Sequence, residues 1–399
     1  MHGLAHVATV SFLASRAAPS LQFFFALGGG IALARSAERG GARTGYGTAL
    51  ASMLQTVAVM GPARINAPLT QAITAPMMGR LQARGAHPLT EFLACLALRL
   101  VHYAVLLAAF IFVILGGIDE FTGSYETLTG WLGIVPQGPV AALAVTAAGQ
   151  FLWAIFFSAI QVAAYRRALA DWPLAAPPVA ERPAPGTYAE RGAGRFDPRA
   201  IVIAALVATA LLLASTSWPL LLGVAAWLIS AWLVCKPDHD AVPLGLVLAG
   251  MLAFAALTGG LLSGAGLELT LRRVLRATLL VAVATWMRAA AGPGGLREAF
   301  RRALRRLRRV PCVKEAAAQM EGLDPGPRLV AAARAAADRL ADVPLAPVPL
   351  VDAVIAWVAA ESADYRPGSG PARPRLRLRA PDALLVALTL TPALALLGA

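Results

Sequence analysis

The sequence predicts an all-α polytopic membrane protein, and three observations lead to this fold class. Hydrophobic residues make up 58% of the chain and charged residues only 14%. Several apolar runs reach the roughly 20 residues that a helix needs to cross the hydrocarbon core. One long polar stretch, from Gly294 to Arg379, interrupts them before a final apolar segment. We expect about ten membrane segments in two halves, with cytoplasmic amphipathic helices before the last span.

The net charge of +13 has a simpler explanation than nucleic-acid binding. The arginines cluster beside apolar segments, as in cytoplasmic loops that set membrane orientation and face anionic lipid. We therefore expect membrane lipids as partners and no nucleic acid. Residues 291–379 should be cytoplasmic in a multi-pass protein of the plasma membrane. The N-terminal apolar stretch lacks a preceding basic region, so we expect no cleaved signal peptide. The scattered Cys95, Cys235 and Cys312 indicate neither a disulfide nor a zinc site.

The first half, residues 1–170, is predicted to be a membrane domain. Residues 4–15 form a marginal spanning helix or an interfacial one, and 19–35 a better span. A hairpin over 46–80 is broken by prolines. Spans over 90–117 and 139–165 enclose a loop that carries acids but no Lys or Arg, so this loop should be external.

A Pro-, Ala- and Gly-rich linker at 171–196 leads to the second half. Membrane spans are expected within 197–290, at about 199–215, 218–235, 241–264 and 268–290. Arg272, Arg273 and Arg276 begin the last of these. They either face protein or water inside the membrane or snorkel at the outer interface.

The polar stretch, residues 291–379, reads as three or four helices, and residues 380–399 as a terminal span. In the first helix, apolar residues at helical spacing lie beside a basic stripe of Arg297, Arg301, Arg305 and Arg308. This stripe fits a lipid-headgroup surface or a partner-docking site made by Arg301, Arg305 and Arg308. Further helices are expected at about 327–340 and 350–364.

Two polar clusters in the first half are candidates for substrate binding. Arg64, Asn66, Thr70 and Gln71 lie in the proline-broken hairpin, where broken helices can line a transporter site; an ordinary external loop is the simpler interpretation. Arg99, His102 and Tyr103 lie within about one turn of a strong span and could meet an anionic group. For them a packed, hydrogen-bonded interhelical cluster is simpler.

Catalytic signatures are missing from the sequence. No Gly-x-x-x-x-Gly-Lys-Ser/Thr motif occurs, so this chain should not hydrolyse ATP by that route. Neither His-Glu-x-x-His nor Gly-x-Ser-x-Gly is present. We expect no enzyme activity, no catalytic residues, no metal site and no bound cofactor.

From Asp197 onward the order of features resembles the transmembrane T component of energy-coupling-factor transporters, which includes the cobalt-transport membrane subunit. Phe196-Asp197-Pro198-Arg199 precedes the first span, and an Arg-containing segment begins the last span before the polar stretch. Tyr365-Arg366, an Arg-rich turn and Asp382 then precede the terminal span. The resemblance rests on the order of these features, and no single motif establishes it.

The resemblance implies that separate ATP-binding-cassette ATPases use ATP and dock on cytoplasmic coupling helices. This chain would couple them to uptake of a vitamin or metal ion. The first half, or a separate membrane subunit, would capture the substrate. The family's coupling motifs of Ala-Arg-Gly type are degenerate here, since Ala363 and Asp364 replace Arg and Gly. The resemblance then leaves four further docking candidates, namely Arg334, Arg339, Glu361 and Arg366. The alternative is a non-transporting scaffold that has lost ATPase coupling.

Overall fold

The computed structural model describes residues 1–62, 66–131, 133, 138–170, 172, 196–235, 242–344, 346–366 and 378–396. Every regular element within these ranges is a helix, which confirms the predicted all-α class. The predicted linker at 171–196 lies almost wholly outside the described residues.

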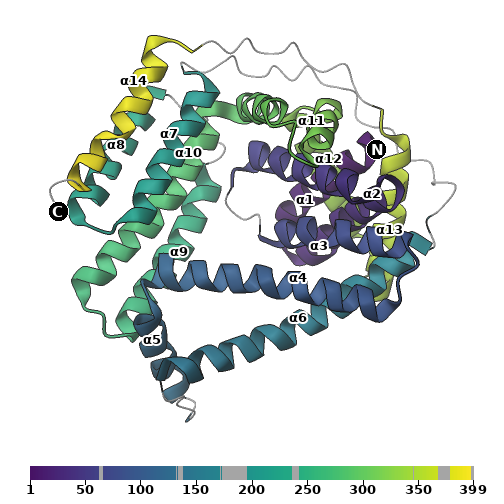
Figure 1. Cartoon of the computed structure of the whole chain (residues 1–399), viewed down its shortest axis with the longest axis horizontal. Helices are drawn as coiled ribbons and strands as arrows, with labels where there is room; N and C mark the ends of the chain where they lie inside the picture. Colours follow the sequence, from purple (N-terminus) through teal and green to yellow (C-terminus); the bar gives the residue numbers. More distant parts are fainter. Residues whose placement is uncertain are drawn as a thin grey trace.

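The first half contains six α-helices in the described part of the chain; α1–α3 cluster together, and α4 and α6 extend from them toward α5 and the second half (Figure 1). Gly41 bends the long second helix by adopting a left-handed φ of 81°, which suits glycine. The predicted external loop after residue 117 is instead mostly helix α5. The elements are α1 (His2–Ala17), α2 (Gln22–Met60), α3 (Asn66–Ala83), α4 (Pro88–Ala109), α5 (Ile118–Gly130) and α6 (Gly138–Ala170).

The second half contains the remaining eight described α-helices. Gly292, with a φ of 66°, bends α10 where its apolar part meets its Arg-rich part. The elements are α7 (Pro198–Ala214), α8 (Trp218–Cys235), α9 (Val242–Leu262), α10 (Leu267–Arg306), α11 (Val313–Gly322), α12 (Gly326–Ala341), α13 (Pro347–Asp364) and α14 (Ala380–Thr389).

Five described helices are long and apolar enough to cross a membrane, so the chain is a helical membrane protein. They are Pro88–Leu115, Gly138–Ala170, Trp218–Cys235, Gly245–Leu262 and Leu267–Arg306, and Pro198–Ala214 and Ala380–Leu394 are shorter apolar helices. About ten membrane segments were expected, and most of those that the structure lacks among the described residues are in the first half. Helix α1 has only 16 residues, and Gly41 divides α2 into two shorter helices.

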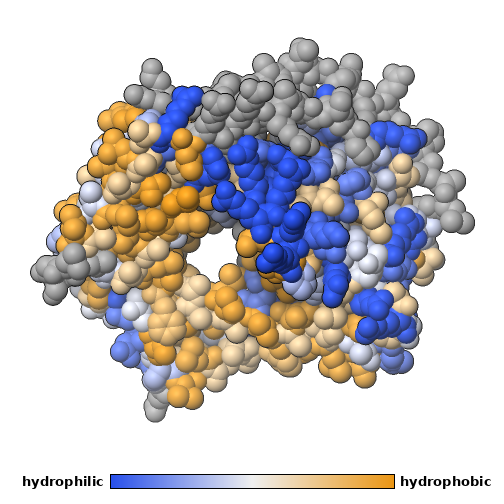
Figure 2. Space-filling model, turned by 45° about the horizontal axis from the view of Figure 1, so that its top comes forward, coloured by the Kyte–Doolittle hydropathy of each residue, from blue (hydrophilic) through white to orange (hydrophobic). Residues whose placement is uncertain are grey.

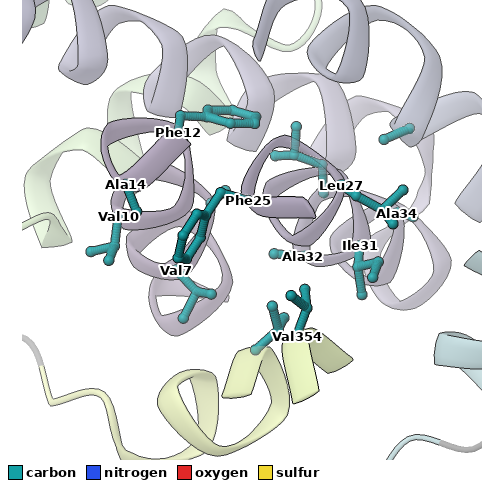
Figure 3. Packing of buried hydrophobic residues seen from close by; sticks show 14 of the residues in the cluster. Val7, Val10, Phe12, Ala14, Phe25, Leu27, Ile31, Ala32, Ala34 and Val354 are labelled. Atoms are coloured by element: carbon teal, nitrogen blue, oxygen red, sulfur yellow. The ribbon is translucent and has the colours of Figure 1, made fainter. Parts of the chain in front are cut away.

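Helix α1 is enclosed by protein, which differs from the expected marginal or interfacial helix. Every residue from Leu4 to Ser15 is buried. The helices around it come from both halves, because α1 packs against α2, α12 and α13. Figure 3 shows Val354 of α13 pointing toward Val7 and Phe25 of the first two helices. One hydrophobic core therefore joins α1 and α2 to the helices predicted to be cytoplasmic.

The two halves also meet at the far end of the first half, where α5 packs against α9. Ser124 donates a hydrogen bond to the carbonyl of Gly259 at 2.8 Å. Between these two regions of contact, Figure 2 shows an opening bordered largely by hydrophobic surface. The halves therefore touch around an opening rather than across one continuous face.

Of the three arginines that begin α10, Arg273 and Arg276 are buried against protein. Arg273 pairs with Glu120 of α5 at 2.7 Å. Arg276 donates to the carbonyl of Val113, in a π-helical turn that continues α4. Only Arg272 lies at the surface, beside Glu268 and over the ring of Trp218. The two buried guanidinium groups thus tie the halves together.

The entry to α7 and the start of α14 are also joined. The backbone N–H of Asp197 donates to Oδ1 of Asp382 at 2.7 Å, and both side chains are buried. Burial alone would raise the pKa of Asp197, but hydrogen bonds from Arg199 hold the pKa below its ordinary value. The Asp-Pro-Arg entry and the terminal Asp, far apart in sequence, therefore form one contact.

Candidate functional site

Polar side chains from α3, α4 and α6 meet inside the first half and form what we call the polar seam. On α3 and on α6 they recur at spacings of three or four residues, which places them on one face of each helix, and α4 contributes a single residue. All are buried. The polar seam consists of Gln71, Thr74, Arg99, Ser158, Gln161 and Tyr165.

Arg99 lies at the middle of the polar seam. Its guanidinium donates to Oε1 of Gln161 and, at 3.2 Å, to the hydroxyl of Tyr103. Gln161 in turn donates to Thr74 at 2.7 Å. This is the interhelical network that the simpler interpretation of Arg99 expects. Two buried polar atoms of the seam, Nε of Arg99 and Oγ of Ser158, have no hydrogen-bond partner among the described residues.

A second pair, Tyr165 and Gln71, closes the seam toward α2, because the Tyr165 hydroxyl donates to Oε1 of Gln71. Gly30 lies directly against this pair, and a Cβ added there would overlap the Tyr165 hydroxyl. The run Gly28-Gly29-Gly30 lies within an apolar segment, where glycines allow close helix contacts. Gly28 makes a second one, since a Cβ there would lie 2.8 Å from Val354 of α13.

The structure brings together only part of the predicted substrate-binding set. Gln71 and Arg99 belong to the polar seam. His102 is buried one turn further along α4, with its ring 6.1 Å from that of Tyr103. Arg64 and the side chain of Asn66 lie outside the described residues. The seam's α6 residues, including Ser158, were not predicted as substrate ligands, although their helical spacing could have suggested it.

Some of the predicted docking residues are exposed and have no ion pair among the described residues, and others, among them the exposed Arg305, pair within the chain. Arg308, Arg334, Arg339 and Arg366 are exposed. Arg301 is buried and pairs with Glu298 at 2.7 Å, and Arg305 pairs with Glu321. The basic stripe on α10 is therefore partly used within the chain. The apolar side of this helix also packs on protein, since Leu296 and Leu304 are buried.

Helix α12 presents two distinct faces. Leu329, Ala333, Ala336 and Leu340 are buried in the core shared with α1 and α2, while Arg334 and Arg339 are exposed. Such an amphipathic helix buries one face and leaves the other free for water or a partner.

A buried polar junction that the sequence did not predict joins α1 to α13. The imidazole of His6 lies 3.5 Å from Glu361 and 3.7 Å from Asp324. It also stacks on Tyr365, with ring centroids 4.2 Å apart. The predicted docking residue Glu361 therefore faces inward. No sequence signal linked His6 to residues so distant along the chain.

Among the described residues, no group of His, Cys, Asp and Glu could hold a metal ion. Comparison with known protein families, curated proteins and solved structures finds no match for this chain. The functional conclusion therefore rests on the residues and their geometry.

Proposed function

We propose that this chain is the membrane subunit of an energy-coupling-factor type transporter. In this proposal it couples separate ATP-binding-cassette ATPase subunits to uptake of a small micronutrient, a vitamin or a metal ion. The second half acts as the T-component-like scaffold, and the first half captures the substrate. ATP is used by the partner subunits, and residues 291–379 lie in the cytoplasm of a plasma-membrane protein.

The observation that carries the proposal is the core shared by α1, α2, α12 and α13. Val354 of α13 touches the α2 segment at Gly28, and two residues further along the chain Gly30 touches the polar seam. A displacement of α12 and α13 would therefore act directly on the first half. An ATPase can shift the populations of two states only if it binds one of them better.

The outer face of α12 supports ATPase docking, because Arg334 and Arg339 are exposed opposite its buried face. Forked arginine donors suit carboxylates and carbonyl groups in a partner groove. Arg308 and Arg366 add two further exposed guanidinium groups at the ends of neighbouring helices.

One observation favours the alternative, a non-transporting scaffold. Where the resemblance implies an outward coupling arginine, the end of α13 buries Glu361 against His6. Ala363 and Asp364 follow at the surface. That end of the helix offers no guanidinium before Arg366.

An affinity pull-down of tagged protein from its native membrane tests the proposal. We expect ATPase subunits to co-purify with the wild type, and at least tenfold less with Arg334→Glu/Arg339→Glu. Charge reversal on an exposed face should leave the thermal unfolding midpoint within a few degrees of wild type.

Arg84→Glu is the matched control, because Arg84 is an exposed arginine of the first half, outside the predicted dock. ATPase that stays bound to the α12 variant would place the dock elsewhere. A wild-type preparation free of any ATPase would leave the scaffold as the function.

A further inference from the structure

Arg99 is a buried cation without a carboxylate partner in the described part of the chain. Helices α3 and α6 contain no Asp or Glu, and α4 contains only Glu91. Glu91 lies eight residues before Arg99, about 12 Å along the helix, and it pairs with Arg166 at 2.9 Å. In α2 the only acid, Glu38, pairs with Arg35. The charge of Arg99 therefore meets neutral groups only.

The depth of Arg99 makes this charge costly. Arg99 is the twelfth residue of the 28-residue apolar span Pro88–Leu115, so it lies within about 4 Å of the midpoint of that span along the helix axis. Ionisable groups at this depth normally pair with each other or lie on a substrate or ion pathway. Arg273, another buried arginine of a membrane helix, pairs with the carboxylate of Glu120, whereas Arg276 and Arg288 of α10, like Arg99, donate to neutral oxygens, here the carbonyls of Val113 and Val59.

The polar seam contains donors that lack a strong acceptor. Nε of Arg99 and the hydroxyl of Ser158 have no hydrogen-bond partner of good geometry among the described residues. Both side chains lie within hydrogen-bonding reach of the thiol of Cys95, which is only a weak acceptor. Tyr103 accepts from Arg99 and keeps its own O–H available. These groups offer hydrogen to an acceptor that carries negative charge.

We propose that the polar seam binds the carboxylate of a small solute, with Arg99 as its counter-ion. A guanidinium matches a carboxylate in a planar, forked pair, which is the strongest ordinary hydrogen-bonded ion pair in proteins. The carboxylate would accept from Arg99 and from Ser158, replacing Gln161 as the acceptor of the Arg99 guanidinium. Gln161 keeps its bond to Thr74.

The position of the seam also gives the ligand a route to the coupling helices. Tyr165 lies against Gly30, and Gly28 of the same helix lies against Val354 of α13. A ligand that shifts Tyr165 would press on the glycine segment that α13 also contacts. The role of the solute as transported cargo rests on the proposed function; its binding does not.

Thermal unfolding of the purified full chain in detergent tests binding without any ATPase. The probes are 100 mM sodium acetate, 100 mM sodium chloride, and 100 mM acetamide, the neutral isostere, added to 100 mM sodium chloride so that the ionic strength is equal. We expect acetate to raise the midpoint by about 2 °C over chloride. Acetamide should give no rise, and Arg99→Met should abolish the acetate effect.

Arg84→Met is the matched control, since it removes an exposed arginine outside the seam, and it should keep the full acetate shift. Arg99→Lys retains the charge but not the fork, so its shift should be smaller than that of wild type. This second variant is informative even if Arg99→Met does not fold.

Three results would overturn the proposal. These are no acetate shift in the wild type, an equal shift in Arg99→Met, or an equal shift with chloride. Mass spectrometry of molecules released on unfolding gives an independent readout. A small carboxylic acid, released from wild type but not from Arg99→Lys, supports the site. Phospholipid lost in the same pattern would instead make the seam a lipid site. Failure of the ATPase pull-down leaves all these outcomes unaffected.

Discussion

At the scale of single residues, small and polar side chains decide how closely the helices approach. The segment Gly28-Gly29-Gly30 touches α13, α1 and α6 in turn, because Gly28 faces Val354, Gly29 faces Phe12 and Gly30 faces Tyr165. In membrane proteins small residues at interfaces allow such close packing. The glycine segment therefore makes α2 the meeting point of the polar seam and α13.

Gly30→Ala should destabilise the protein, because its methyl group would overlap the Tyr165 hydroxyl and strain the pair with Gln71. We expect a loss of about 1–3 kcal/mol in unfolding free energy, the usual cost of overpacking. Gly149→Ala in α6 is the control. No atom lies within 4 Å of a Cβ at Gly149, so helix propensity should make this change neutral or slightly stabilising. Chemical unfolding in mixed micelles measures both; equal effects would contradict the proposed contact.

A close helix contact at Gly28-Gly29-Gly30 can be predicted from the sequence, because glycines within an apolar membrane helix commonly lie where another helix approaches closely. The partners of that contact were not predictable. The hydropathy pattern shows that α1 is apolar on all sides. Such a helix can be surrounded either by lipid or by a protein core, and hydropathy does not distinguish the two. In the same way, the sequence indicated that Arg273 and Arg276 were unusual, while their partners Glu120 and Val113 required the three-dimensional arrangement.

At the scale of elements, the amphipathic helices after Gly292 follow their predicted periodicity but pack on a different surface. The first of them was expected to lie along a lipid surface or a docking partner, yet its Leu296 is fully buried in protein, as is Leu329 of α12. A basic amphipathic pattern predicts only that the apolar face of the helix is buried away from water. Whether lipid or α1 covers that face depends on residues far away in the sequence.

Asp382→Ala should loosen the terminal helix α14. Asp382 accepts hydrogen bonds from the backbone N–H groups of Asp197 and Arg379, both at 2.7 Å. Removing the carboxylate leaves a buried N–H at Asp197 unsatisfied, which typically costs about 1–3 kcal/mol. Limited proteolysis near the C-terminus and chemical unfolding should both report the change.

Asp382→Asn keeps one acceptor oxygen and should lose less stability than Asp382→Ala. Stability should decrease in the order wild type, Asp382→Asn, Asp382→Ala. Equal stability of the two variants would mean that the hydrogen bond to Asp197 contributes nothing measurable.

At the scale of the whole molecule, the two halves form one unit through contacts on opposite sides of the opening in Figure 2. On one side α12 and α13 share a core with α1 and α2. On the other side Arg273 pairs with Glu120. The sequence predicted two halves joined by a linker, and it could not predict that the polar stretch would pack on the first half.

Cutting the chain in the 171–196 segment should therefore leave the halves associated. We would insert a site-specific protease sequence after Pro183, cleave the purified protein in mild detergent, and apply it to a size-exclusion column. Both fragments should elute together, because the shared core and the buried Arg273–Glu120 pair hold them. Separation of the fragments would show that only the covalent connection holds the halves.

A matched pair of variants identifies the contact responsible. Val354 is fully buried in the shared core, whereas Val348 of the same helix is 57% exposed. Val354→Asp places a carboxylate in that core, at a cost that should be several kcal/mol, and should release the cleaved first half. Val348→Asp should leave the complex intact. If Val354→Asp fails to fold before cleavage, Val354→Ala should still weaken association measurably, since truncating a buried valine removes about 1–2 kcal/mol of packing.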